Sequence, residues 1–537
     1  MPRFRVTPHP LTQRQIDCPS QLTARPRFPI LSNLSEPNET EVSGSSVREA
    51  PKNLGGTLKE LGPGLIIAGS VVGSGELIAT TVAGAEAGFF LLWVILIGCF
   101  IKVFVQLEIG KFTILTGKTA LGSLGELPGW KPAGLHWIAW FVVLLFLGTI
   151  GQMGGVVGGV GQALTIAVPI TEEGKAFNEV SDAMVRAQLA EVEGIEVSGT
   201  MEVPDVLPEP GPDIYIWSLI LAVATAVILF LGRYKFIEKA VTIFVIGFTL
   251  MSLLNIFLLQ QNGTWAVSWS EFFQGLKFQF PPKVAGVYPL ATALAAFGII
   301  GMAAGELIFY PYWCLEKGYA KHVGLRENTK EWESRAHGWI RVMKWDAWGS
   351  MAIYTISTVA FYLLGAAVLG RAGLHPEGMN MIRTLSAMYE PVFGEWAVGL
   401  FLIGAVMVLY STFFVNNASS AYVWADVVFR VAGRGRKRIN RYSFHRTFCV
   451  ALPLLSFVLF YFIPKPKAWI IFAGMLQTLM LPLLGYAAIR FRFDLGGKAF
   501  RTRKLGDTMI FVSALGLLVA GGWLLLTLLF PGIRELG

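Results

Sequence analysis

Two glutamates in apolar surroundings are the residues best placed to do chemistry. Glu76 and Glu306 each stand in the tetrapeptide Gly-Glu-Leu-Ile, inside stretches made almost entirely of apolar and small residues. A carboxylate at the centre of a bilayer costs about 2.5 to 3.5 kcal/mol, so each one needs a cation, a proton or a fixed positive charge to offset its burial. We expect cation binding from this pair.

Glycines accompany both glutamates, and they predict where the helices are interrupted. Glycine lowers the cost of leaving a helix, and non-helical backbone at membrane depth is tolerated only where it is buried in protein or lines a wet cavity. We therefore predict a break in each of the two stretches. The candidate metal site consists of Gly73, Glu76, Met302, Gly305 and Glu306.

The donor set indicates a hard cation. Two carboxylates and freed carbonyls, with Ser70 and Ser74 nearby, form an oxygen environment suited to Mg²⁺, Ca²⁺ or Mn²⁺. A lone methionine such as Met302 is more often core filler, so selection of a soft metal is not indicated. None of the six histidines lies in the middle of an apolar stretch, which disfavours a histidine proton relay. We expect the metal as a substrate and no bound cofactor.

Other polar residues within apolar stretches could share or oppose this role. Lys102 could neutralise one glutamate, in which case the pair would be a structural ion pair instead of a cation site. Asn416 and Asn417 could line a permeation path, although hydrogen bonding between helices is the commoner use of such residues in membranes. With Ser70, Ser74 and Arg446, these residues are permeation or coupling candidates.

Composition predicts an integral membrane protein. Of the 537 residues, 54% are hydrophobic and 15% are charged, with a mean hydropathy of +0.56. A span needs roughly 20 mostly apolar residues, because the hydrocarbon core is ~30 Å thick. We predict about eleven membrane-spanning helices, at residues 61–82, 88–115, 135–167, 214–232, 239–260, 287–314, 345–370, 396–429, 446–463, 467–490 and 508–530.

Loop charges orient these helices. The loops on one side are basic throughout, whereas the opposite side includes the acidic segment 170–213, so we expect a cytoplasmic N-terminus and an extracytoplasmic C-terminus. Residues 1–56 are polar and read as a disordered cytoplasmic tail, and residues 57–537 as the transmembrane domain. We expect segment 170–213 to be a solvated loop. The net charge of +8 is spread over short loops, which argues against a nucleic-acid partner.

The two interruptions fall in the first and sixth predicted helices. Paired breaks at corresponding positions of two halves are typical of inverted-repeat transporters, which hold ions where the repeats meet. A five-plus-five repeat with one extra helix requires eleven spans, in agreement with the span count. We therefore predict an all-α, 5+5 inverted repeat with discontinuous helices 1 and 6.

The chain resembles the Nramp family of divalent metal transporters at these residues. The likeness is strongest from Gly62 to Gly117, through Gly62-Pro63, Gly88-Phe89 and Thr116-Gly117, and it continues from Gly298 to Tyr310. This resemblance implies a LeuT-type fold and transport of a divalent metal cation across a cell or inner membrane.

The ligand motifs depart from that family. Its Asp-Pro-Gly-Asn motif falls on Gly73-Ser74-Gly75-Glu76 and its Met-Pro-His motif on Gly305-Glu306-Leu307, while a single arginine, Arg446, stands where the ninth helix often has a pair. The resemblance therefore implies a rewritten site in which Glu76 and Glu306 replace the lost aspartate and methionine. Acidic residues tied to proton transfer in the third helix are absent, which makes proton coupling doubtful.

Two other functions remain open from the sequence. A carrier of an organic amine or amino acid could use the glutamates to recognise an ammonium group, and a membrane scaffold or sensor could keep the fold without transport. We do not expect an enzyme, since no nucleophile with a base and no phosphate-binding loop is readable. The oligomeric state is not predicted.

Overall fold

The computed structural model describes residues 47–194, 207–232, 235–282, 289–394, 396–432, 441–495, 497, 500 and 504–530. Throughout these ranges the regular structure is helical, without a strand. Most of the predicted tail, residues 1–46, lies outside the described residues, as does part of the acidic segment, residues 195–206.

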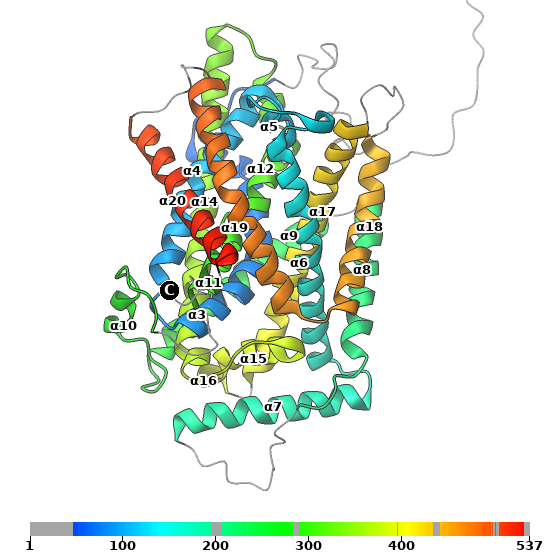
Figure 1. Ribbon diagram of the computed structural model, residues 1–537, viewed down its shortest axis with the longest axis vertical. Coiled ribbons are helices and arrows are strands. Elements are labelled where there is room, and N and C mark those ends of the chain that lie inside the picture. Colours follow the sequence, from blue (N-terminus) through cyan, green and yellow to red (C-terminus); the bar gives the residue numbers. More distant parts are fainter. Residues whose placement is uncertain are drawn as a thin grey trace, which may run out of the picture.

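Long apolar helices run side by side along the long axis of the molecule (Figure 1). Their bounds are α2 Pro63–Val71, η2 Val72–Thr80 and α3 Thr81–Ala87, which together form the first span; α4 Leu92–Thr116; α6 Trp137–Ala167; α8 Asp213–Leu231; α9 Lys235–Leu259; α11 Pro289–Ile299 and α12 Ala304–Glu316; α14 Lys330–Leu364 with η4 Gly365–Gly370; α17 Trp396–Ala432; α18 Arg441–Phe462; α19 Pro466–Arg490 with η7 Phe491–Leu495; and α20 Lys504–Leu529.

Ten of these helices in the described part of the chain are long and apolar enough to cross a membrane. The predicted span 239–260 corresponds to α9, which has 25 residues and whose stretch Val245–Leu259 is apolar. Each of the other ten predicted spans overlaps one of these ten, of which Pro289–Glu316 consists of α11 and α12. α14 begins at Lys330, well before the predicted start at 345, because Thr329 caps its N-terminus by accepting a hydrogen bond from the backbone N–H of Trp332.

Short helices lie at the two ends of the bundle. They are α1 Leu54–Glu60, α5 Ala120–Leu124, η3 Pro132–Gly134, α10 Trp269–Gln274, α13 Tyr319–Val323, η5 Gly378–Asn380, α15 Met381–Ser386, η6 Ala387–Tyr389 and α16 Glu390–Phe393. α5 is at the end opposite α7, α15 and α16 (Figure 1).

The two predicted interruptions take different forms. Helix six is broken outright, because α11 ends at Ile299 and α12 begins at Ala304. Helix one stays helical but changes to a π-helix, η2, over Val72–Thr80, where we had expected an unwound stretch. A π-helical segment widens the turn without removing all of its hydrogen bonds, and such segments are frequent at functional sites.

Residues 172–193 of the acidic segment form a helix, where we had expected a solvated loop. Helix α7 spans Glu172–Glu193 and lies across the end of the bundle (Figure 1). Thr171 caps its N-terminus. The acidic Glu172 and Glu173 occupy its first turn, where their negative charges interact favourably with the positive end of the helix dipole. Its buried side recurs every three or four residues, at Gly174, Phe177, Ser181, Val185 and Leu189.

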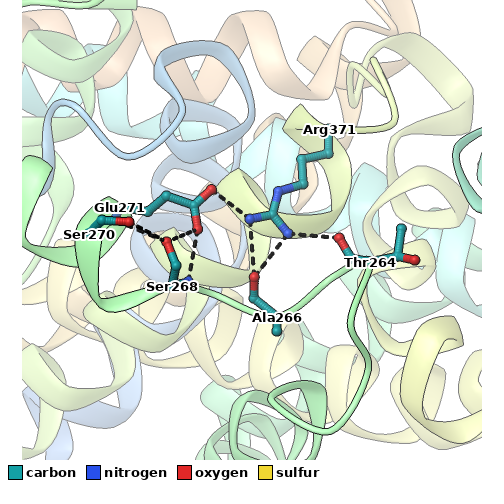
Figure 2. A network of polar contacts seen from close by, with 6 residues as sticks. All are labelled: Thr264, Ala266, Ser268, Ser270, Glu271 and Arg371. Atoms are coloured by element: carbon teal, nitrogen blue, oxygen red, sulfur yellow. Dashed lines mark hydrogen bonds and ion pairs between the residues drawn. The ribbon is translucent and has the colours of Figure 1, made fainter.

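The segment 264–271, which follows α9, is hydrogen-bonded to Arg371 at the end of η4 (Figure 2). Arg371 donates to the carbonyl oxygens of Thr264 and Ala266 at 3.0 and 3.1 Å, and it pairs with Glu271 at 2.7 Å. Glu271 also forms a capping box with Ser268 at the start of α10. Burial opposes ionisation of Glu271, but hydrogen bonds from Ser268 and Arg371 outweigh it and hold the pKa of this carboxyl below its usual value.

Candidate metal site

Hydroxyl groups of α17 hold the π-helical segment of the first span in place. Ser411 donates to the carbonyl oxygen of Gly69 at 3.0 Å, and Thr412 donates to that of Ser70 at 2.6 Å. The hydroxyl of Thr412 also accepts a hydrogen bond of 3.2 Å from the backbone N–H of Gly73. Two carbonyls at the end of α2 and one N–H of η2 are thus bonded to hydroxyls of the neighbouring helix.

Gly73 is a packing position in this structure. A Cβ atom there would lie 2.3 Å from Thr412 Oγ1 and 2.9 Å from the carbonyl oxygen of Val408, so only glycine lets α17 approach this closely. Thr412 therefore fills the space that a larger residue at position 73 would need. We expected Gly73 within the metal site, and its role there is to admit Thr412.

The break in helix six presents its backbone to Glu76. Gly301 has a φ of +57°, and a Cβ atom there would lie 2.8 Å from a ring carbon of Tyr354 and 3.1 Å from the sulfur of Cys99. Both constraints require glycine. The backbone N–H of Gly301 donates to Glu76 Oε1 at 3.1 Å, and the hydroxyl of Thr358 on α14 donates to the same oxygen at 2.8 Å.

Each glutamate keeps one buried carboxylate oxygen without a protein partner. These oxygens are Oε2 of Glu76 and Oε2 of Glu306, and the two side chains are 0% and 6% exposed. Glu76 accepts a hydrogen bond from Gly301 in the break, and Glu306 lies in the first turn of α12, directly after the break. A buried ionised carboxylate without a partner is strongly unfavourable, so two such oxygens on residues beside the same break indicate a place for a positively charged ligand.

A chain of neutral polar groups connects the two interrupted helices. Gln152 on α6 donates to Ser74 Oγ at 3.1 Å and accepts a hydrogen bond of 3.1 Å from Gln477 on α19. Gln477 in turn accepts a hydrogen bond of 3.0 Å from the backbone N–H of Gly305. Every link in this chain is an amide or a hydroxyl.

Asn416 joins the site from α17. Its side-chain amide donates to Ser70 Oγ at 2.8 Å, and the residue also interacts with Glu306. Ser70 and Ser74 thus bond to residues of neighbouring helices, and Asn416 connects Ser70 with Glu306.

Lys102 is brought to the break but bonds to carbonyls. Its ammonium donates to the carbonyl oxygens of Phe297 and Ile300, the latter at 2.9 Å, both at the end of α11. The hydrogen bonds that the structure gives this ammonium therefore go to the backbone of the break, with no carboxylate among their acceptors. The predicted alternative, a structural ion pair between Lys102 and a glutamate, is not what the geometry shows.

Three candidates take no visible part in this arrangement. Asn417 donates to the carbonyl oxygen of Phe413 within its own helix, at 2.7 Å. Arg446 lies on α18 with its guanidinium 4.0 Å from the centre of the Phe230 ring on α8. Met302 lies in the break and is fully buried in the core. In the described ranges, no group of three His, Cys, Asp or Glu side chains could hold a metal.

Sequence reasoning missed four residues that shape the site. Gln152, Gln477, Thr358 and Thr412 each bond to a residue of the interrupted helices. The signal was present for the glutamines, because strongly polar side chains in the interior of apolar spans are rare and often functional. The hydroxyls carried no such signal, since Thr and Ser are common in membrane helices.

The bundle of long apolar helices, with a π-helical first span and a broken sixth helix, defines a polytopic membrane transporter of the LeuT-type fold. The sequence model of the Natural resistance-associated macrophage protein-like family, Nramp, matches residues 64–527. The chain belongs to this family, which confirms the predicted class of divalent metal transporters and does not favour an organic amine carrier or a scaffold.

Solved structures share the fold at low sequence identity. The manganese transporter of Eremococcus coleocola, in complex with an aromatic bis-isothiourea substituted compound, has a TM-score of 0.56 at 14% identity, over 91% of this chain and 92% of that one. A mutant of the same transporter has a TM-score of 0.55 at 14% identity, over 90% and 91%. No curated protein matches the chain by sequence.

Proposed function

We propose that the chain carries a divalent cation of the Mg²⁺ or Mn²⁺ kind, bound as substrate between Glu76 and Glu306. One observation carries the proposal: each glutamate is buried and keeps one carboxylate oxygen without a protein partner. A divalent cation would satisfy both oxygens and offset both charges. The glutamates come from η2 and α12, so binding would connect the two interrupted helices.

The surrounding donors favour a hard ion. Asn416 bonds to Ser70 and interacts with Glu306, and Ser74 precedes Glu76 by two residues, so the polar side chains nearest to the glutamates in contact or in sequence offer oxygen atoms. Mg²⁺ and Mn²⁺ prefer such ligands, and Mg²⁺ commonly keeps several waters and binds through one or two carboxylates. Met302 is the only sulfur among the candidates, and nothing in its contacts directs it to the carboxylates.

We propose that transport is not coupled to protons through α6. Its residue beside the site is Gln152, which bonds to Ser74 and Gln477. Side-chain amides do not gain or lose a proton as acids or bases near neutral pH. The two glutamines can therefore orient the interrupted helices but cannot relay a proton. Uptake of the cation should leave the pH on the far side of the membrane unchanged.

The proposed orientation places the N-terminus in the cytoplasm and the C-terminus outside. The support is the basic composition of the loops on one side, against the acidic α7 on the other. Membrane-impermeant thiol labelling of intact cells would test it. A cysteine at Glu173 should react, whereas one at Thr329 should react only after the membrane is opened, and the reverse pattern would overturn the orientation.

Ion flux into proteoliposomes tests the site itself. We expect the wild type to take up Mn²⁺, with Mg²⁺ as a competitor, and Glu306→Gln to reduce uptake by at least tenfold at low ion concentration. Glu86→Gln is the matched control, because Glu86 lies on α3 at the end of the same first span and pairs with Lys467 at 3.0 Å, away from the break. Equal uptake by Glu306→Gln and the control would remove Glu306 from the site.

A further inference from the structure

A single ammonium group occupies the end of the first half of the broken helix. Lys102 is fully buried, in the middle of α4, and it donates to the carbonyl oxygens of Phe297 and Ile300. Because α11 ends at Ile299, these carbonyls have lost their partners in the next turn. They also carry the negative end of the helix dipole, which favours a cation.

Helix α4 packs tightly against this end. The Phe297 ring lies against Gly98, where a Cβ atom would approach a ring carbon to 2.8 Å. The Lys102 ammonium lies 4.6 Å from the centre of the same ring, within range of a cation–π interaction. The ammonium is thus held by two carbonyls and one aromatic face.

Unwound carbonyls and the C-terminal ends of half-helices are the groups that hold coupling ions in secondary transporters. We propose that the Lys102 ammonium is a tethered cation that takes the place of a mobile monovalent cation at the C-terminal end of α11. Lys102 is a positioning residue in this account, since it touches the backbone of the break and not the transported ion.

A fixed charge here also limits which ions the site admits. With both carboxylates ionised and Lys102 protonated, these three groups would carry a net charge of −1, so one bound divalent cation would make the region positive. A second mobile cation beside it would be repelled. This step rests on the proposed function, and it means that divalent transport requires no Na⁺ or K⁺ as partner.

The test measures cation-specific stability, a readout that does not depend on divalent transport. The midpoint of thermal unfolding, Tm, of the purified full-length protein is compared in NaCl, KCl and choline chloride at equal ionic strength. Wild type should show the same Tm in all three salts. Lys102→Met empties the pocket, so Na⁺ or K⁺ should raise its Tm by about 2 °C or more relative to choline.

Lys111→Met is the control. Lys111 is also buried on α4, but its partner Glu108 pairs with Arg492 as well and stays neutralised, so loss of Lys111 should create no preference among the three salts. Lys102→Gln is a second variant, whose amide can still donate to one carbonyl and should give a smaller salt preference. Mn²⁺ uptake by Lys102→Met should become dependent on Na⁺ or K⁺.

Either of two results would overturn the proposal. One is a folded Lys102→Met protein with equal Tm in all three salts. The other is that both Lys102 variants fail to yield monodisperse protein in every salt. The proposal predicts that Na⁺ or K⁺ replaces the missing ammonium and rescues the fold. If Glu306→Gln left uptake unchanged while Lys102→Met gained its salt preference, the metal site would fail and the tethered cation would stand.

Discussion

Replacing Glu76 by glutamine should weaken ion binding without unfolding the protein. Glutamine keeps the oxygen that accepts from Gly301 at 3.1 Å and from Thr358 at 2.8 Å, so the anchoring of the side chain to the break survives. What it loses is the negative charge and the second oxygen, Oε2, which has no protein partner. The change therefore acts on the ligand and not on the fold.

The expected size follows from the burial of this charge. Removing one member of a buried charge pair typically costs 2 to 5 kcal/mol, and we take about 3 kcal/mol because hydroxyls, carbonyls and water can replace one ligand in part. Each ~1.4 kcal/mol is a factor of ten, so Kd for Mn²⁺ should rise by about 10²-fold. Tm without added metal should stay close to that of the wild type.

The assay combines titration calorimetry with flux. Mn²⁺ is titrated into wild type, Glu76→Gln and the control Glu86→Gln, and uptake into proteoliposomes is measured at an ion concentration below the wild-type Kd. A Kd for Glu76→Gln within threefold of the wild type, together with unchanged uptake, would refute the reasoning. A large fall in Tm would instead show that the charge serves the fold.

Three further predictions follow from individual contacts. Gly73→Ala should lower both the yield of folded protein and flux, because its Cβ would lie 2.3 Å from Thr412 Oγ1; a fully active variant would show that α17 can retreat. Met302→Leu should leave the preference of the transporter between Mg²⁺ and Cd²⁺ unchanged, because the sulfur of Met302 is not a ligand in this account. A loss of Cd²⁺ binding would show that it is one. The pKa of Glu271 is lowered when folded, so its contribution to stability is complete above its unfolded pKa and is lost as pH falls through the folded value. Arg371→Met should therefore reduce Tm modestly at pH 7 and by less in acid, as measured by thermal unfolding, and a deficit that grows in acid would contradict this sign.

The fold was predictable because its signals are long and redundant. Some 20 apolar residues in a row allow little besides a membrane helix, and the repeated Gly-Glu-Leu-Ile placed both interruptions correctly. Amphipathic α7 was not predicted, since its apolar residues, such as Phe177 and Leu189, are sparse within a strongly acidic segment. Its helical spacing was the signal that could have revealed it.

The site was predictable in its charged members but not in its neutral ones. A buried carboxylate demands compensation wherever it falls, so Glu76 and Glu306 stand out in any apolar sequence. The partners of Lys102 could not be predicted from the sequence, because they are backbone carbonyls, which every residue type has. Gly73 stands where the family's motif has a ligand, but the close approach of Thr412 to it depends on the packing of α17, which the sequence alone does not show.

The most direct test of the central claim is to locate the ion. Anomalous diffraction from crystals of the full-length protein grown with Mn²⁺ reveals the metal independently of the protein density. The account predicts one peak between the carboxylates of Glu76 and Glu306, within ligand distance of at least one oxygen of each, and none at the carbonyls that bind Lys102. A peak elsewhere, with both carboxylates unoccupied at saturating Mn²⁺, would contradict it.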